Sequence, residues 1–333
     1  GMGTTATIMQ LPGGQLMVGV IGLAIIGYGI SLIVRGWTEK FRENLDAQGQ
    51  SGQDGSAYVT LGKVGYIAKG VSIVIVSFDS REYLERCLDA VAGGVHEVVV
   101  VDNASEDGSP ALVRERFPSV RLIELPENLG FGAANNVGMD AAAGELFLLL
   151  NSDAWPVGDA IEGLAAFVAE RPRVGVVGPR LQNPDGSLQP SVRGWPTTWR
   201  LATEYLFLRR LGPRTRAFNA FYGAGFDHES ERRVEVVKGA VMLLRREAYE
   251  ATGGFDPDFF MYGEEMDLCY RAARAGWEVV FDPDAEFVHV GGASTGVRWG
   301  ERPAFGPMRR EQLRGHLRYI AKHEGPRSAE RAR

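Results

Sequence analysis

The first regular pattern of hydrophobic and polar positions begins at Val71. There the apolar run VSIVIVSF is followed by REYLERCLDAV, in which Leu84, Leu88 and Val91 recur at helical spacing. The same alternation repeats through the strand-like segments HEVVVVDNAS, VRLIEL and ELFLLLNSDA and the helix-like segment FGAANNVGMDAAAG. Apolar runs rich in β-branched residues are typical of buried strands. Strands that alternate with helices predict an α/β fold, in which a mostly parallel sheet is flanked by helices on both faces.

The second half of the chain is less regular. Residues 174–194 predict a short strand and a hairpin turn at NPDGS, and residues 196–232 mix aromatic and basic residues without a clear period. VEVVKGAVMLLRREAYEATGGF again predicts a strand and a helix, and MRREQLRGHLRYIAKH predicts a last helix before a charged tail. We therefore expect a main domain over residues 71–305, with a C-terminal helix and tail over residues 306–333.

The N-terminal region follows a different pattern, because LMVGVIGLAIIGYGISLIV runs for nineteen residues without a charge. This length suits the core of a bilayer. A signal peptide is disfavoured, since no basic residue precedes the stretch. The predicted segments are a tail (1–15), a transmembrane helix (16–36) and a polar linker (37–70). The basic residues that follow the stretch, Arg35, Lys40 and Arg42, predict a single-pass protein of the cell membrane with its main domain in the cytoplasm.

Composition narrows the classes of function. A chain of 333 residues with 45% hydrophobic residues can fill a large core, and its formal net charge of -6 gives no basic surface of the kind that nucleic acid requires. Cys87 and Cys269 both lie in helix-like patterns. We interpret them as buried apolar residues rather than a disulfide framework, which agrees with a reducing compartment.

Polar residues gather where the predicted strands end. They occur at Ser77 to Asp79, at Asp102 to Ser105 and at Asn151 to Asp153. Ligands of mostly parallel α/β sheets bind at the carboxyl ends of the strands. The pattern therefore predicts one binding crevice at this edge of the sheet.

Four segments in one order carry a resemblance to a known family: VSIVIVSFDSREYLERCL, VVVVDNASEDGS, NLGFGAANNVGMDAAAGELFLLLNSDA, and GGFDPDFFMYGEEMDLCYRAARAGW with VHVGGAST after it. Together they resemble the family 2 glycosyltransferases with the GT-A fold, most closely bacterial rhamnosyltransferases that act on polyprenyl-diphosphate-linked sugars. The resemblance covers residues 71–323. It implies a Rossmann-like mixed sheet and a nucleotide-sugar donor.

The resemblance also implies roles for residues at the strand ends. Asp102 would contact the base or ribose of the donor, and Asp153 of the NSD element would hold Mg²⁺ or Mn²⁺ at the donor diphosphate. His289 would complete the metal or diphosphate site. The other nucleotide-binding residues that follow from it are Ser77, Asp79, Asn128, Gly130, Asn135 and Ser152.

The acids of FFMYGEEMDLCYR match the family's acid pair at a helix start. On this match Glu265 deprotonates the acceptor hydroxyl, Glu264 is its neighbour and Asp267 has a supporting or capping role. Acids in a first helical turn are also stabilised by the helix dipole alone, so that interpretation stays open. The preceding aromatic residues would desolvate a carboxylate and raise its pKa.

Acceptor recognition is the least determined part of the sequence. Candidate acceptor residues are aromatic, charged and spread over the second half, and each is equally compatible with packing or a local ion pair: Arg193, Trp195, Trp199, Lys238, Asp267 and Arg298. The partners implied are a nucleotide-sugar donor, a polyprenyl-linked or polysaccharide acceptor and the membrane.

Residues 1–70 depart from the transferase pattern. They resemble part of a multi-spanning actinobacterial membrane-protein family of unknown function, which suggests a fusion. For the whole chain we expect an inverting, metal-dependent glycosyltransferase that moves L-rhamnose from dTDP-rhamnose to a lipid-linked or cell-envelope glycan. The alternatives are a UDP-sugar-dependent transferase of the same family, a nucleotidyltransferase, and an inactive membrane scaffold.

Overall fold

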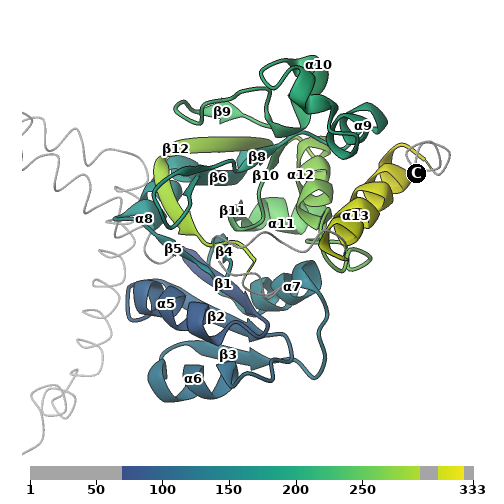
Figure 1. Cartoon of the computed structure of the whole chain (residues 1–333). Helices are drawn as coiled ribbons and strands as arrows, with labels where there is room; N and C mark the ends of the chain where they lie inside the picture. Colours follow the sequence, from purple (N-terminus) through teal and green to yellow (C-terminus); the bar gives the residue numbers. More distant parts are fainter. Residues whose placement is uncertain (1–69, 293–306, 326–333) are drawn as a thin grey trace, which may run out of the picture. The chain divides into compact units, whose positions relative to one another are not determined.

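A computed structural model describes residues 70–292 and 307–325 (Figure 1). One compact unit, Ile67–Arg333, contains every described helix and strand. The predicted transmembrane helix and linker and the candidate Arg298 lie outside the described residues. Within those residues, no helix is both long enough and apolar enough to cross a bilayer.

A mixed sheet of ten strands forms the centre of the unit, and its main path runs in the order β3-β2-β1-β4-β11-β6-β12-β5 (Figure 1). β1 to β4 run parallel, whereas β11 is antiparallel to both β4 and β6. β8 and β10 form a separate two-stranded sheet. The strands are β1 (Val71–Ser77), β2 (Glu97–Asp102), β3 (Arg121–Glu124), β4 (Leu146–Leu150), β5 (Ala154–Pro156), β6 (Val174–Gln182), β7 (Leu188–Gln189), β8 (Val192–Arg193), β9 (Arg232–Arg233), β10 (Val236–Val237), β11 (Val241–Arg245) and β12 (Glu278–His289).

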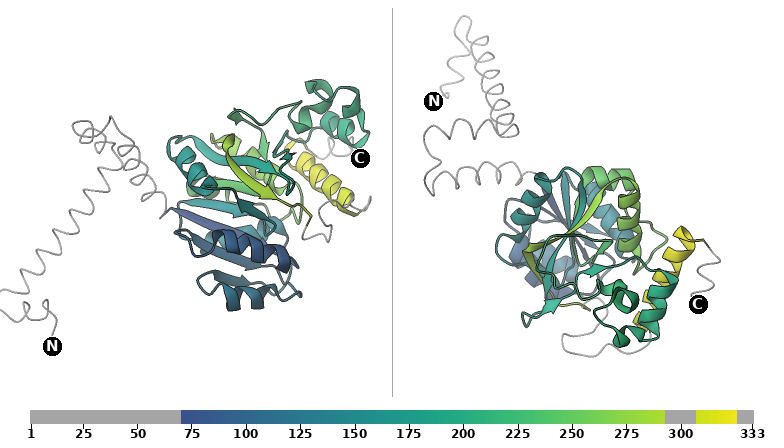
Figure 2. Two further views of the ribbon diagram at one scale, coloured as in Figure 1. Left: turned by 60° about the vertical axis from the view of Figure 1, so that its left-hand side comes forward. Right: turned by 90° about the horizontal axis from the view of Figure 1, so that it is seen from above.

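Helices cover both faces of the sheet (Figure 2). One hydrophobic core lies under α5, α6 and α8, and a second lies under α7, α11, α12 and α13. The helices are α5 (Arg81–Val91), α6 (Ser109–Arg116), α7 (Phe131–Ala141), α8 (Ala160–Ala169), α9 (Thr198–Tyr205), η1 (Leu208–Leu211), α10 (Arg216–Asn219), η2 (Ala220–Tyr222), α11 (Arg246–Thr252), α12 (Glu264–Arg274) and α13 (Pro307–His323).

The two cores explain the continuous apolar run of β1. Ile73 and Ile75 belong to the first core and Val74 belongs to the second, because successive side chains of a strand point to opposite faces. Cys87 and Cys269 are free thiols, one in each core, as expected of apolar filling residues. The predicted α/β sheet flanked by helices is therefore confirmed.

Residues 196–232, for which the sequence predicted no regular element, form short helices and one short strand. α9, η1, α10 and η2 follow one another between β8 and β9. Their lengths of three to eight residues leave too few turns for a helical period to be recognised. This helical insertion lies beside α13 (Figure 2).

Candidate active site

The carboxyl ends of β1, β2 and β4 meet at one edge of the sheet. Ser77 at the end of β1 is paired in register with Asp102 at the end of β2. A chain of buried hydroxyls then joins β1 to the segment after β4: the oxygens of Ser77 and Ser80 are 3.2 Å apart, and Ser80 donates to Ser152 over 2.8 Å. The predicted convergence of polar strand ends is thus present in the structure.

Asp102 has one carboxylate oxygen that accepts from the backbone N–H of Ser105 over 2.9 Å. Its other oxygen, Oδ1, is buried and has no hydrogen-bond partner among the described residues. The side chain as a whole is only 3% exposed. A buried acceptor without a partner is costly, so this oxygen is suited to receive an N–H or O–H group from a ligand.

Asp79 lies beside Asp102 and holds the same loop. Its Oδ1 accepts from the N–H of Glu106 over 2.8 Å, and its own N–H donates to Ser105 Oγ over 3.1 Å. The left-handed φ of 45° at Asp79 brings these contacts about at the end of β1. Asp79 and Asp102 therefore fix the β1 and β2 loops to each other.

The segment 128–130 closes another side of the crevice. Asn128 Oδ1 accepts from Asn103 Nδ2 over 2.8 Å and from the N–H of Gly130 over 2.9 Å. Gly130 has a φ of +84°, and a β-carbon there would lie 2.2 Å from the carbonyl oxygen of Phe260. Only glycine permits this approach. Asn135, predicted to join the pocket, is buried in α7 and donates to the carbonyl of Phe131 in its own helix.

Asp153 and His289 come together because β5 pairs with the end of β12, where His289 lies opposite Ala154. Asp153 Oδ1 lies 3.3 Å from His289 Nε2, and Asp153 Oδ2 accepts from the N–H of Gly291 over 3.0 Å. His289 Nδ1 is 2.6 Å from Gln189 Oε1, which can only accept, so Nδ1 carries the proton. Burial and the charge of Lys238 lower the pKa of His289, which favours the neutral ring.

This pair has the chemistry of a divalent-cation site. A neutral imidazole nitrogen and a carboxylate oxygen face each other as acceptors, and Gln189 fixes the tautomer from behind. Mg²⁺ and Mn²⁺ accept such ligands and retain water or phosphate oxygens as the others. No group of three or more His, Cys, Asp or Glu that could hold a metal occurs in the described part of the chain. The two residues therefore fit a cation that is shared with a phosphate group.

Two half-buried cations, Lys238 and Arg193, line the crevice next to this pair. Lys238 Nζ donates to Gln189 Oε1 over 2.6 Å, and burial together with the charge of Arg193 lowers the pKa of Lys238 to about 7. The Arg193 guanidinium lies 4.6 Å over the ring of Tyr222, and burial lowers its pKa as well. β8 and β10 bring the two cations together, since Lys238 N–H bonds to the carbonyl of Ser191. Asp153 and Glu265 both favour the charged form of Lys238.

Glu264 and Glu265 begin α12, directly after Gly263 with its φ of +98°. Glu264 is buried, and its Oε2 has no hydrogen-bond partner within the described ranges. Burial and the charge of Glu265 raise the pKa of Glu264 well above its ordinary value. Burial also raises the pKa of Glu265, but the N–H of Gly263 and the charges of Arg193 and Lys238 act in the opposite direction. When the pair shares one proton, that proton therefore belongs on Glu264.

The C-terminal helix packs directly on the loop before this acid pair. At Gly315 of α13 a β-carbon would lie 1.8 Å from the carbonyl oxygen of Tyr262. An apolar groove of about 730 Å³ runs between α13 and residues 259–262. Tyr262 lines this groove, and burial together with the charges of Glu264 and Glu265 raises its pKa.

Other predicted acceptor residues lie differently. Asp267 is fully buried, and its two oxygens are engaged by Arg271, Lys322 and His323 at 2.7 Å. It anchors α13 to α12, so the predicted acceptor role of Asp267 is replaced by a structural one. Trp195 packs edge-on against Tyr270 at 5.3 Å between ring centroids. Trp199 is exposed on α9.

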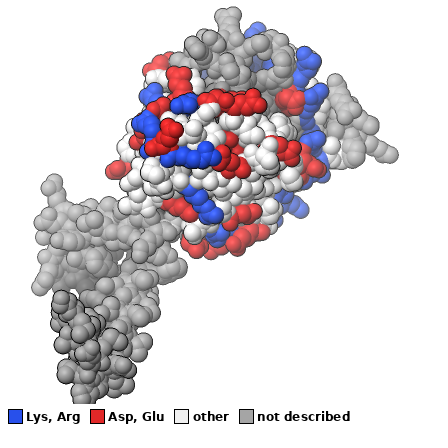
Figure 3. All heavy atoms as spheres, turned by 90° about the horizontal axis from the view of Figure 1, so that it is seen from below, with Lys and Arg blue, Asp and Glu red and all other residues white. Residues whose placement is uncertain are grey.

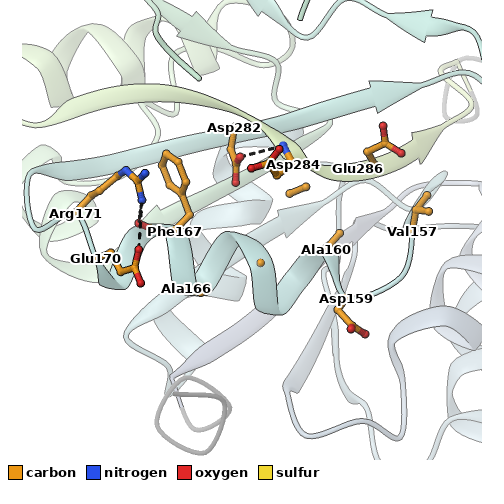
Figure 4. Close-up of a pocket in the computed structure, with 12 residues that line it drawn as sticks. Val157, Asp159, Ala160, Ala166, Phe167, Glu170, Arg171, Asp282, Asp284 and Glu286 are labelled. Carbon is orange, nitrogen blue, oxygen red and sulfur yellow. Dashed lines mark hydrogen bonds and ion pairs between the residues drawn. The ribbon is translucent and has the colours of Figure 1, made fainter. Parts of the chain in front are cut away.

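A second cavity of about 530 Å³ lies between α8 and β12 (Figure 4). Its acidic lining includes Asp159, Asp284 and Glu286, together with the buried Asp282. Asp282 Oδ1 accepts from the N–H of Asp284 over 3.1 Å. None of the strand-end residues described above lines this cavity.

Sequence reasoning missed three residues of the crevice. Gln189 joins Lys238 to His289, Ser80 joins the ends of β1 and β4, and Asn103 holds the segment 128–130. Gln189 and His289 are 100 residues apart along the chain, and no local pattern marks a lone glutamine after a turn. Asn103 lies within the predicted polar segment Asp102 to Ser105 and Ser80 directly follows Asp79, so their position was predicted but not their role.

Comparison with known proteins identifies this class of site. Residues 72–234 match the model for glycosyl transferase family 2, and residues 2–39 match a Domain of Unknown Function (DUF1206). The chain is 35% identical over 239 residues to the N-acetylglucosaminyl-diphospho-decaprenol L-rhamnosyltransferase of Mycobacterium tuberculosis, covering 67% of this chain and 77% of that protein. It is 28% identical over 285 residues to the O-antigen biosynthesis protein RfbC of Myxococcus xanthus, covering 80% of this chain and 21% of that protein.

A solved structure shows the same fold. The mannosyltransferase PcManGT from Pyrobaculum calidifontis, in complex with GDP-Man and Mn²⁺, superposes with a TM-score of 0.50 at 23% identity, covering 76% of this chain and 63% of that chain. The chain belongs to glycosyltransferase family 2. It is a transferase of hexosyl groups with a GT-A-like domain. The predicted family and enzyme class are confirmed, and the nucleotidyltransferase interpretation is wrong.

Proposed function

We propose that the protein is an inverting, metal-dependent transferase that moves L-rhamnose from dTDP-rhamnose to a lipid-linked glycan acceptor. The observation that carries the mechanism is the position of Lys238, which lies within electrostatic reach of both Asp153 and Glu265. Lys238 thereby connects the Asp153–His289 pair on the donor side with the Glu264–Glu265 pair on the acceptor side. The rhamnose and the lipid-linked acceptor are supported by the name of the mycobacterial relative.

The donor is held at the carboxyl ends of the strands. Asp102 Oδ1 accepts from the base or ribose, which gives this oxygen its missing partner. Ser77, Asp79 and Ser152 hold the surrounding loops, and Asn128 and Gly130 shape the wall beside them. Asp153 and His289 would hold a Mg²⁺ or Mn²⁺ ion beside the donor diphosphate. The ion would supply positive charge that stabilises the leaving nucleoside diphosphate.

The proton moves at Glu265. Its carboxylate removes the proton from the acceptor hydroxyl while the hydroxyl oxygen attacks the anomeric carbon. The bond from that carbon to the diphosphate oxygen breaks on the opposite side, so the configuration inverts in one displacement. Glu264 keeps its proton and leaves the negative charge on Glu265. Arg193 and Lys238 stabilise the negative charges on both sides of the reaction.

The membrane location remains a proposal based on the uncharged stretch at residues 16–34 and the basic residues that follow it. A single-pass anchor with the catalytic domain in the cytoplasm would hold the active site close to a polyprenyl acceptor. Labelling of introduced cysteines from either side of sealed membrane vesicles tests this topology. Labelling of the catalytic domain only from the outer side of the cell would contradict it.

The experiment that tests the function is a transfer assay with the full chain in detergent. It offers dTDP-rhamnose, UDP-glucose or UDP-N-acetylglucosamine to a polyprenyl-diphosphate N-acetylglucosamine acceptor, with Mn²⁺ or with a chelator. We expect product only from dTDP-rhamnose with Mn²⁺. Product from a UDP-sugar alone would replace the rhamnose proposal by the alternative donor.

Two variants separate the roles in that assay. Glu265→Gln should bind the nucleotide, as measured by a thermal shift with dTDP, but lose about 10²- to 10⁴-fold in rate. Glu247→Gln removes a first-turn acid from α11 away from the crevice and is the matched control. Normal turnover by Glu265→Gln would refute the assignment of the base and leave helix-start stabilisation as its role.

A further inference from the structure

The helical insertion and α13 together expose an unusual surface, here called the insertion surface. Of the seven large hydrophobic side chains exposed within the described residues, four lie on the insertion between positions 199 and 211. They are Trp199, Leu206, Phe207 and Leu211, with exposures of 54%, 66%, 36% and 74%. Clusters of exposed apolar side chains often mark the sites at which a protein binds a partner or a membrane.

These side chains are held outward by the local structure. The indole of Trp199 donates to the carbonyl of Ala217 over 2.7 Å and contacts the ring of Phe218. Phe207 has a φ of +58°, a conformation that a residue with a β-carbon rarely adopts. α9 directs Leu201 into the core on its other side. The Trp199 indole is therefore held by a hydrogen bond while the residue stays exposed.

Positive charge surrounds the apolar side chains. Residues 198–222 and 307–323 together contain ten Arg and Lys and two Glu, in a chain whose net charge is -6. One of the two acids, Glu204, is buried and engaged by Arg209 and Arg309. Figure 3 views the molecule from below, the side away from α9 and α10, and on that face Lys and Arg mix with Asp and Glu. The exposed arginines of this surface are Arg209, Arg210, Arg214, Arg216, Arg310, Arg314 and Arg318.

We propose that the insertion surface docks onto the face of a lipid bilayer that carries anionic headgroups. Arginines attract the negative headgroups, and Trp, Phe and Leu side chains enter the boundary between headgroups and acyl chains. Exposed leucines distinguish this surface from one that binds nucleic acid, where phosphate contacts dominate. The surface adjoins the groove at α13, because Arg314 and Arg318 belong to both. The role of this docking in sugar transfer rests on the proposed lipid-linked acceptor, whereas the binding of the surface to a bilayer does not.

Co-flotation of residues 67–333 with vesicles tests the docking. This fragment contains both hydrophobic cores in full, and it lacks the uncharged stretch that would carry the whole chain to a bilayer. We expect it to float with vesicles of phosphatidylcholine and phosphatidylglycerol and to remain below vesicles of phosphatidylcholine alone. Failure to float with the mixed vesicles would overturn the proposal.

Surface variants locate the contact. Leu206→Asn with Leu211→Asn, and separately Arg210→Gln with Arg214→Gln and Arg216→Gln, should each lower the bound fraction about tenfold or more. The matched controls are Val95→Asn, which is 66% exposed elsewhere, and the triple change Arg114→Gln, Arg116→Gln and Arg173→Gln on other exposed arginines. If the control variants lost as much of the bound fraction, the effect would be non-specific, and the assignment of the contact to the insertion surface would be refuted.

Two further measurements separate this inference from its alternatives. Sedimentation of the fragment without vesicles should give a monomer, and a dimer abolished by the leucine variant would assign the surface to a second copy instead. In the full chain, both surface variants should retain wild-type turnover of a short, detergent-soluble acceptor. Vesicle binding without any transferase activity would support the docking and refute the proposed function.

Discussion

Replacement of Gly315 by alanine tests how α13 positions the acid pair. The new β-carbon would lie 1.8 Å from the Tyr262 carbonyl oxygen and 2.7 Å from the carbonyl carbon. Both contacts are with backbone, so α13 or the loop must move by roughly 1.2 Å to reach an acceptable distance. Tyr319 and Ile320, which α13 places in the second core, must move with it.

Two energies act against each other in this variant. Alanine in a helix interior gains up to about 1 kcal/mol over glycine. Overpacking against a rigid backbone costs about 1–3 kcal/mol. We therefore expect Gly315→Ala to lower the free energy of unfolding by up to about 2 kcal/mol. Because a displacement near 1 Å at a reacting group costs up to ~10²-fold in rate, kcat should fall about 10- to 100-fold while the KM for the donor changes little.

Urea unfolding and steady-state kinetics measure both effects, with Gly163→Ala as the control. Gly163 lies inside α8, where a β-carbon meets no atom within 4 Å, so alanine there should stabilise the protein and leave its kinetics unchanged. If Gly315→Ala were as stable as Gly163→Ala and transferred sugar at the wild-type rate, the close contact with Tyr262 would not position the acid pair.

Three further predictions follow from the crevice. The transfer rate should rise with pH through an apparent pKa above the usual glutamate value, because burial raises the pKa of Glu265. Lys238→Met should shift this rise in rate to higher pH, because it removes a cation that favours ionised Glu265. An unshifted pH profile would contradict this prediction. Gln189→Leu should raise the Mn²⁺ concentration needed for half-maximal rate about 10- to 100-fold, whereas Gln182→Leu should not. Asp267→Ala should lower the free energy of unfolding by about 1.5–3 kcal/mol in urea titrations, because it removes the buried carboxylate that Arg271, Lys322 and His323 share, and an effect below about 1 kcal/mol would refute the anchoring role.

The sequence predicted the parts of the fold that depend on local pattern. β1, β2 and β4 are continuous apolar runs, since both of their faces are buried, and α5 and α12 carry clear helical spacing. It could not predict the antiparallel insertion of β11 between β4 and β6, because pairing partners are set by contacts between residues far apart in the chain. The short helices of the insertion also lacked a readable period.

For the site, residue type and position predicted which strand ends would converge. Asp102 ends β2, and Asp153 Oδ1 lies 3.3 Å from His289 Nε2, while the roles that the resemblance implies for these residues stay predictions. The contacts of Asp267 were not predicted, because its partners Lys322 and His323 come from α13, and the docking of this helix cannot be read from the motif. Gln189 was missed for the same reason: its role exists only once β7 has paired with β6 beside His289.

The carbonyl of Phe260 has a consequence for how this chain can vary. It accepts from the N–H of Phe131 over 3.0 Å and leaves no room for a β-carbon at Gly130. A side chain at position 130, or a change in length at residues 259–263, would therefore demand a compensating change in the other segment. Among relatives these two segments should therefore covary in residue type and in length.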